Sequence, residues 1–138
     1  MIQKKRIAVL GSTGSIGTQA LEVVRSHREA FEVTVLVARR STELLIAQAL
    51  EFSPAVVVIS DEAYYPEVRQ ALSHTSIEVM AGSEAIAEAV VRPDVDIVLT
   101  AMVGFSGLVP TLAAITAGKT IALSNKETLV VAGELIMS

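Results

Sequence analysis

Short, uninterrupted apolar runs alternate along this chain with segments of helical period, and this alternation constrains the fold more than any other feature. The run Val56-Val57-Val58-Ile59 contains no polar residue. A strand that is apolar on both sides is typical of a parallel sheet covered by helices on both faces. Strands are expected at residues 7–10, 33–38, 55–60, 77–80, 97–102 and 120–123.

The segments between these strands predict helices, at residues 16–25, 42–52, 61–73, 83–92 and 108–115. The second is expected to stop before Pro54, because a residue that precedes proline disfavours the helical conformation. Pro66 is expected in a late first turn, Ser83 as an N-cap and Gly118 as a C′ residue. This order predicts an α/β fold of the Rossmann-like, doubly wound kind, with a mainly parallel sheet and helices on both faces.

Composition narrows the class of protein further. The 138 residues suit one domain, and 51% apolar residues with a net charge of −4 exclude disorder. The absence of cysteine excludes a disulfide scaffold and a thiol nucleophile. No apolar run approaches the ~18 residues that span a bilayer, and a pI near 5.1 argues against general binding to phosphate backbones. We therefore expect neither a membrane nor a nucleic acid as partner.

Mean hydropathy is high, at +0.56. Either the sheet is buried on both faces, or some of the surface is normally covered. The final segment, residues 126–138, is predicted to be helical and has no stop signal. It is read either as a frayed terminus or as a sign that the sequence belongs to a longer protein.

A glycine-rich turn joins the first predicted strand to the first predicted helix. Gly11, Gly14 and Gly17 follow the spacing G-x-x-G-x-x-G. Gly11 permits a tight exit from the strand, Gly14 lets the backbone approach a pyrophosphate, and Gly17 allows close packing of helix on strand. Glycines that serve only the turn are the alternative.

The same turn offers hydrogen-bond donors. The backbone N–H groups of Thr13, Gly14, Ser15 and Ile16 are expected to face anionic oxygens, helped by the helix dipole. The hydroxyls of Ser12, Thr13 and Ser15 are expected to add donors. A dinucleotide-binding site is therefore predicted here.

The end of the second predicted strand bears on the choice between NAD and NADP. NAD sites usually carry an acidic residue there, whereas this chain has Arg39, Arg40 and Ser41. Two guanidinium groups and a hydroxyl suit a 2′-phosphate, which favours NADP. The alternative is a solvated arginine pair with a Ser41 or Thr42 cap.

The ends of two later predicted strands are further candidates for binding a cofactor or substrate. Residues 100–107 leave a strand through Gly104 and Gly107, which would let a cofactor lie against the backbone, although an ordinary loop is equally possible. In Asn125-Lys126-Glu127, capping alone could explain the first and third residues. Lys126 at a helix N-terminus opposes the dipole, so a nearby anion such as a substrate phosphate would rationalise it.

The remaining polar residues give weaker indications of a functional site. Asp61 is expected to cap the next helix, and Asp94 and Asp96 are expected in a turn. No histidine or carboxylate cluster has the spacing of a metal site, and the G-x-S-x-G motif is absent.

Several motifs together resemble the N-terminal domain of the 1-deoxy-D-xylulose 5-phosphate reductoisomerase family. The matching stretches, which span essentially the whole chain, are residues 10–17, 50–54, 102–104, 107–108, 110–115, 117–120 and 125–127. The glycine turn alone is weak support, but Ala-Gly-Lys-Thr followed by Asn-Lys-Glu at this distance makes the combination specific.

The resemblance implies roles for individual residues. Thr13, Gly14, Ser15 and Ile16 would contact the NADPH pyrophosphate, and Arg39, Arg40 and Ser41 would hold the 2′-phosphate side. The family often has glycine at the position of Arg39, which puts the contact of that residue in doubt. Asn125 and Glu127 would touch the cofactor, and Lys126 the sugar-phosphate substrate.

The resemblance also implies an activity. The family rearranges the carbon skeleton of its substrate with a divalent metal (magnesium, manganese or cobalt), and NADPH then reduces the aldehyde to 2-C-methyl-D-erythritol 4-phosphate. Its metal-binding carboxylates lie after the Asn-Lys-Glu segment. Residues 1–138 are therefore expected to form an NADPH-binding domain without catalytic or metal-binding residues, inactive alone, from a homodimeric enzyme.

No targeting segment is seen, so a bacterial cytoplasm or a plastid-type organelle is expected. Two other functions stay open. One is a different NADP-dependent oxidoreductase, such as a semialdehyde or homoserine dehydrogenase. The other is a stand-alone NADPH-binding or sensing module.

Overall fold

A computed structural model describes residues 4–101 and 108–122 of the chain. Within them, six strands form one parallel sheet in the order β4-β3-β2-β1-β5-β6. The strands are β1 (Lys5–Leu10), β2 (Phe31–Ala38), β3 (Val56–Ile59), β4 (Glu78–Ala81), β5 (Ile97–Thr100) and β6 (Thr120–Ala122). The helices are α1 (Ser15–Ser26), α2 (Thr42–Phe52), the 3₁₀ turn η1 (Glu62–Tyr64), α3 (Tyr65–Ala71), α4 (Ser83–Val90) and α5 (Leu108–Thr116).

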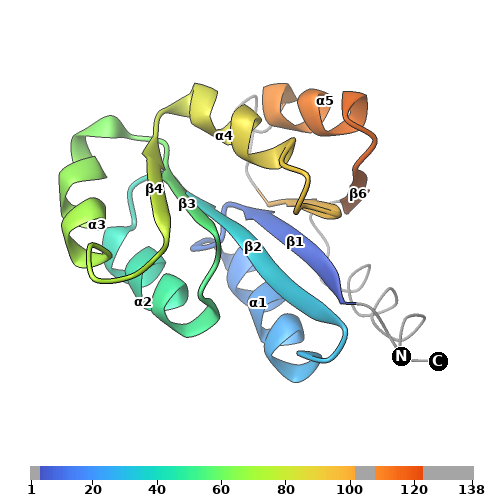
Figure 1. Cartoon of the computed structure of the whole chain (residues 1–138), viewed down its shortest axis with the longest axis horizontal. Coiled ribbons are helices and arrows are strands. Elements are labelled where there is room, and N and C mark those ends of the chain that lie inside the picture. The colour runs from blue at the N-terminus through green and yellow to red at the C-terminus, as the bar shows by residue number, and fades with distance from the viewer. Residues whose placement is uncertain (1–3, 102–107, 123–138) are drawn as a thin grey trace.

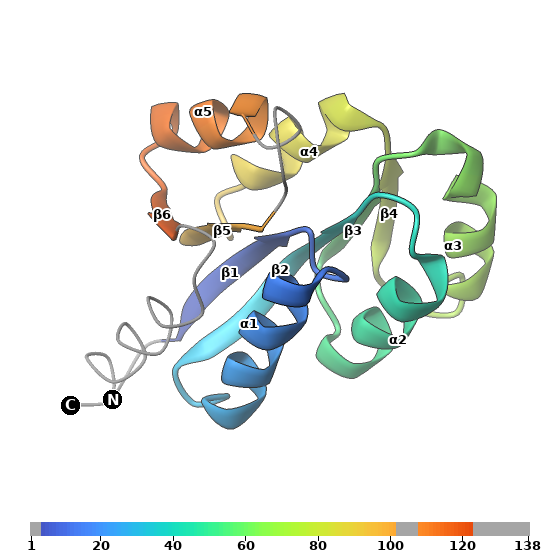
Figure 2. The ribbon, with the colours of Figure 1, turned by 180° about the vertical axis from the view of Figure 1, so that it is seen from behind.

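Helices cover both faces of this sheet, as Figures 1 and 2 show: α1, α2 and α3 lie on one side, and α4 and α5 on the other. Each side has its own apolar core. Leu21 of α1 and Leu45 of α2 pack on Ile7 and Val9 of β1, whereas Ile86 of α4 packs with the strand residues of the opposite face. All four residues of β3 are buried. The predicted doubly wound α/β fold is confirmed.

Strand β2 contains one residue more than its pairing with β1 requires. Ile7 pairs with Val33, but Ala8 pairs with Val35, so Thr34 is extra. Residues two apart in a regular strand share a face. Here Val33 lies in the core beneath α1 and α2, and Val35 lies in the core beneath α4. The bulge therefore reverses the facing of β2 partway along the strand.

One predicted helix cap is wrong, and the helix predicted at 61–73 is divided into η1 (Glu62–Tyr64) and α3 (Tyr65–Ala71). Gly82 at φ 94° is the N-cap of α4, and Ser83 is its first helical residue, so the predicted Ser83 cap is wrong. The left-handed backbone that ends the preceding loop favours glycine at that position. Pro66 does stand in the first turn of α3, and Gly118 has φ 79° after α5, as predicted. The predicted helix at 126–138 lies outside the described residues.

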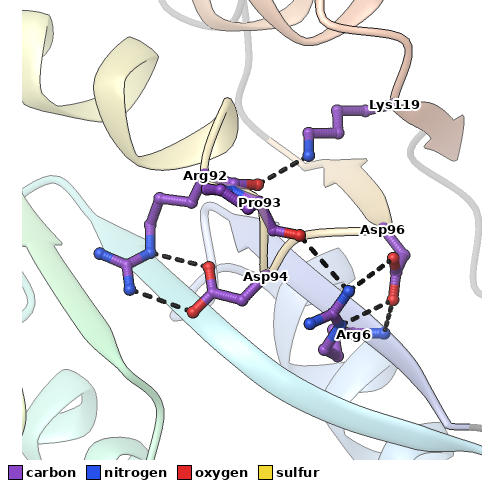
Figure 3. Close-up of polar contacts among 6 residues, drawn as sticks. All are labelled: Arg6, Arg92, Pro93, Asp94, Asp96 and Lys119. Carbon is purple, nitrogen blue, oxygen red and sulfur yellow. Dashed lines mark hydrogen bonds and ion pairs between the residues drawn. The ribbon is translucent and has the colours of Figure 1, made fainter.

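Ion pairs tie the amino ends of the strands together (Figure 3). The Arg6 side chain donates from Nε to Asp96 Oδ2 at 3.0 Å, and its backbone N–H donates to the same oxygen at 2.8 Å. Arg92 holds Asp94 through two bonds, and Lys119 Nζ donates to the Arg92 carbonyl oxygen at 2.7 Å. Asp94 and Asp96 thus stabilise the predicted turn before β5. Among the described helices, none has the length and apolarity to cross a membrane.

Candidate functional site

The glycine turn closes over the carboxyl end of β1. Gly11 has φ 88°, a conformation that favours glycine. The N–H groups of Gly11 and Ser12 donate to the carbonyl oxygen of Val37 at 2.8 and 2.9 Å. The turn is therefore anchored across β2, and the predicted tight exit at Gly11 is confirmed.

Gly17 lies where α1 meets this turn. A Cβ atom at position 17 would stand 2.0 Å from the carbonyl oxygen of Gly11 and 2.7 Å from Cα of Ser12. Such distances are far inside van der Waals contact, so only glycine fits there. Close helix-on-strand packing at Gly17, as predicted from the spacing, is confirmed.

The first turn of α1 contains two of the predicted backbone donors, Ser15 and Ile16. Gly14 is the N-cap residue in extended conformation, and as a glycine it has no side chain with which to cap the helix. The first-turn N–H groups of Ser15 and Ile16 have no acceptor within the helix. The Gly14 N–H instead donates to the Gly11 carbonyl oxygen at 3.3 Å, so it is partly used by the loop. Among the described residues, a Cβ at Gly14 would meet nothing closer than the Gly11 carbonyl oxygen at 3.7 Å, which leaves this backbone open to a ligand.

Ser12 does not supply the hydroxyl donor that the sequence suggested. The residue is fully buried, and its Oγ has no hydrogen-bond partner among the described residues. A side chain without exposed surface does not meet a ligand that approaches from solvent. Thr13 is partly exposed and Ser15 is exposed, so their hydroxyls remain accessible.

A buried glutamine supports the turn from below, and sequence reasoning missed it. Gln48 of α2 donates from Nε2 to the Ser12 carbonyl oxygen at 2.8 Å, across 36 positions of sequence. Gln48 is only 6% exposed. Its signal in the sequence was a lone amide in an otherwise apolar stretch of helix.

The arginine pair lies just beyond the end of β2. Arg39, Arg40 and Ser41 are all exposed. Arg40 donates from Nε to Asp61 Oδ2 at 3.0 Å, whereas the Arg39 side chain has no partner within the described part of the chain. Ser41 occupies the N-cap position of α2 without a side-chain hydrogen bond. The predicted capping role for Asp61 is confirmed, since it accepts from Ala63 N–H.

The parallel pairing brings these segments to one edge of the sheet. Leu10 pairs with Val37, so the glycine turn and the arginine loop leave neighbouring strands in the same direction. The Ala101 N–H donates to the Leu10 carbonyl oxygen at 2.8 Å, which places the end of β5 beside them. The sheet order reverses between β1 and β5, the location at which doubly wound folds bind ligands. The predicted site residues Asn125, Lys126 and Glu127 lie outside the described residues.

These groups fit a dinucleotide phosphate. Open backbone at Gly14, helix N-terminal N–H groups that have no acceptor within α1 and two exposed guanidinium groups all favour anionic oxygens. They do not fit a metal ion: residues 4–101 and 108–122 contain no cluster of three or more histidines and carboxylates able to hold one.

The family model for 1-deoxy-D-xylulose 5-phosphate reductoisomerase matches residues 7–133. The chain belongs to this family. The reductoisomerase of Bacteroides fragilis is 57% identical over 135 residues, which cover 98% of this chain and 35% of that protein. The chain therefore spans about a third of the length of the curated reductoisomerases it matches.

Solved reductoisomerase structures share the fold. The reductoisomerase of Zymomonas mobilis in complex with NADPH superposes with a TM-score of 0.83 at 38% identity, over 98% of this chain and 35% of that one. A reductoisomerase solved with NADPH, fosmidomycin and magnesium has the same TM-score at 36% identity, over 96% of this chain and 33% of that one. The resemblance inferred from the sequence motifs is confirmed.

Proposed function

We propose that this chain is the NADPH-binding part of a 1-deoxy-D-xylulose 5-phosphate reductoisomerase. The whole enzyme would convert 1-deoxy-D-xylulose 5-phosphate to 2-C-methyl-D-erythritol 4-phosphate by metal-assisted rearrangement and reduction. One observation carries the proposal: a chain of this family places an open glycine turn and an exposed arginine pair at the same sheet edge.

Two groups of described residues would bind different parts of NADPH. Thr13, Gly14, Ser15 and Ile16 would hold the pyrophosphate, with the first-turn amides of α1 as the principal donors. Arg39, Arg40 and Ser41 would hold the 2′-phosphate. NADPH supplies the hydride when bound, and the protein supplies its binding and orientation.

We propose separate binding sites for the substrate and the metal. Lys126 would bind the phosphate of the sugar substrate, and Asn125 and Glu127 would contact NADPH. We propose residues 1–138 as a cofactor-binding domain. The divalent metal would be held by parts of the reductoisomerases that the match does not cover, since those relatives are about three times as long as the matched stretch. The homodimer and the cytoplasmic or plastid location stay predictions.

Direct titration tests the cofactor assignment. NADPH should bind the intact protein at least about tenfold tighter than NADH, because a bidentate arginine contact to phosphate is worth roughly a factor of ten or more. Equal affinities for the two nucleotides would contradict it.

Turnover tests the reaction. The intact protein should oxidise NADPH when supplied with 1-deoxy-D-xylulose 5-phosphate and magnesium or manganese, and lose this activity with a chelator. Selective NADPH binding without turnover by the intact protein would overturn the reductoisomerase assignment. The stand-alone binding module would then be the better explanation.

A further inference from the structure

Asp61 lies directly beside the arginine loop. It follows β3, whose last residue Ile59 pairs with Ala38 of β2. The backbone pairing continues past both strand ends: Ser60 N–H donates to the Ala38 carbonyl oxygen at 2.9 Å, and Asp61 N–H donates to the Arg39 carbonyl oxygen at 3.1 Å. The backbone of Asp61 is therefore fixed in register with the loop that carries both arginines.

The Asp61 side chain is fixed as well. Its Oδ1 accepts from Ala63 N–H at 3.1 Å, which begins η1, and its Oδ2 accepts from Arg40 Nε at 3.0 Å. The Asp61 side chain is 29% exposed and that of Arg40 is 61% exposed. The carboxylate is thus the anchored member of the pair, and it restricts a long side chain that would otherwise sample many rotamers in solvent.

The contact leaves the phosphate-binding end of Arg40 available. A guanidinium group carries five N–H donors, of which Asp61 accepts one, at Nε. The terminal nitrogens have no partner among the described residues, and they can grip two phosphate oxygens side by side. Asp61 therefore orients the guanidinium without occupying the edge that a phosphate needs.

We propose that Asp61 is a positioning residue that holds Arg40 for the 2′-phosphate of NADPH and thereby raises the preference for NADPH over NADH. This inference rests on the proposed function. Ordering a long side chain before binding removes an entropic cost that the ligand would otherwise meet, and the expected gain in affinity is about three- to tenfold.

The opposite effect is the physical alternative. A carboxylate close to a bound phosphate repels it, and Glu62 and Glu84 line a hollow together with Asp61. If negative charge dominates, removal of Asp61 should tighten NADPH binding. Positioning and charge repulsion thus predict changes of opposite sign for the same substitution.

The substitution must spare the cap of η1. Asparagine carries an NH2 donor in place of one carboxylate oxygen, so it would keep one of the two contacts without fixing which, and it does not separate them. Serine and threonine are good cap residues too short to reach Arg40. Asp61→Ser is therefore the test variant and Asp61→Thr the second. Glu62→Ala is the matched control, because it removes one negative charge from the adjacent position and leaves the Arg40–Asp61 contact.

The measurement is the dissociation constant of the intact protein for NADPH, NADH and 2′,5′-ADP. Asp61→Ser should weaken NADPH and 2′,5′-ADP binding about three- to tenfold and leave NADH binding unchanged, which also shows that the variant folds. In an Arg40→Ala background, Asp61→Ser should change nothing further. Glu62→Ala should leave the NADPH-to-NADH ratio unchanged or raise it slightly.

Three results would overturn the inference. The first is an unchanged or increased NADPH preference in both Asp61 variants. The second is an equal loss of NADPH and NADH affinity, which would indicate only a structural cap. The third is a wild-type protein that binds neither nucleotide or does not discriminate between them, which would also overturn the proposed function. The first two results, obtained with a wild type that prefers NADPH, reject the positioning role alone.

Discussion

Gly17 and Gly11 lie so close that a Cβ on the first would stand 2.0 Å from the carbonyl oxygen of the second. Gly11 ends the strand side of the turn and Gly17 belongs to α1, so this contact sets how near the helix approaches the sheet. The N-terminal amides of α1 are positioned over the end of β1 as a result.

Two alanine substitutions should separate the roles of the glycines. Gly17→Ala forces backbone apart and should lower the free energy of unfolding by about 2–3 kcal/mol or more. Gly14→Ala would place a Cβ no closer than 3.7 Å to any described atom, so it should cost at most about 1 kcal/mol, from the poorer N-cap that alanine makes. Its Cβ should nevertheless weaken NADPH binding about tenfold, by standing between the backbone and the pyrophosphate. Urea denaturation and nucleotide titration measure the two effects, and a Gly14→Ala variant that binds NADPH normally would remove Gly14 from the site.

The Gln48 contact should matter more than the Ser12 hydroxyl above it. Gln48→Leu deprives the buried Ser12 carbonyl oxygen of its side-chain donor. It also removes Gln48 Oε1, which is buried without a partner among the described residues, so the net loss in the free energy of unfolding should be about 1 kcal/mol, with a looser turn. Ser12→Ala removes a buried hydroxyl that has no partner in the described part of the chain, so it should be neutral or stabilising. Denaturant unfolding of both variants checks this. Equal losses would show that the hydroxyl, too, is hydrogen-bonded.

The two arginines should contribute unequally to NADPH selectivity. Arg40 is held by Asp61, whereas Arg39 has no side-chain partner among the described residues. Arg40→Ala should therefore erase most of the NADPH preference, roughly tenfold, and Arg39→Ala should reduce it by about threefold or less. Titration of each variant with both nucleotides gives the ratios. A larger effect from Arg39 would mean that it, not Arg40, carries the main phosphate contact.

The ion pair between Arg6 and Asp96, at the amino ends of the strands, should affect the stability of the fold in acid without affecting NADPH affinity. The side-chain hydrogen bond from Arg6 lowers the pKa of Asp96 below its ordinary value of 3.8, opposed in part by desolvation. The unfolded state then takes up this proton first. The resulting stability is fully present above the unfolded pKa and is lost as the pH falls through the lower folded-state pKa.

Asp96→Asn should therefore lower stability at neutral pH and flatten its decline in acid. Urea denaturation at several pH values between about 7 and 3 shows the difference in slope. NADPH affinity at neutral pH is the control, since Asp96 lies at the opposite ends of the strands from the glycine turn. If the free energy of unfolding falls equally with pH in variant and wild type, the ion pair does not cause the loss of stability in acid.

Local chemistry made most of the fold predictable. Continuous apolar strands indicate burial on both faces. Gly11 and Gly17 could be assigned separate roles because each meets a distinct steric demand, whereas the role of Gly14 at a pyrophosphate stays a prediction. Pro66 and Gly118 could be placed for the same reason. Ser83 was misplaced because a hydroxyl residue resembles a cap, while the left-handed backbone at Gly82 is fixed by the loop before it.

Parts of the candidate site formed by one continuous stretch of sequence could be predicted. Contacts between segments that are distant in the sequence could not. The 39–41 loop follows its strand directly. The partners Asp61 and Gln48 come from other elements, and only the strand order and helix placement bring them to Arg40 and Ser12. The burial of Ser12 is likewise visible only in three dimensions.

The extra residue in β2 has a consequence for any attempt to transplant the site. Phe31 and Ala38 stand at the two ends of the strand, an odd number of positions apart, yet both lie in the core of the α1–α3 layer. A regular strand of equal length would send them to opposite layers. A graft that moves the whole of β2 with the arginine loop must therefore keep Thr34, because without it the residues before and after position 34 could not both face the layers that they face here.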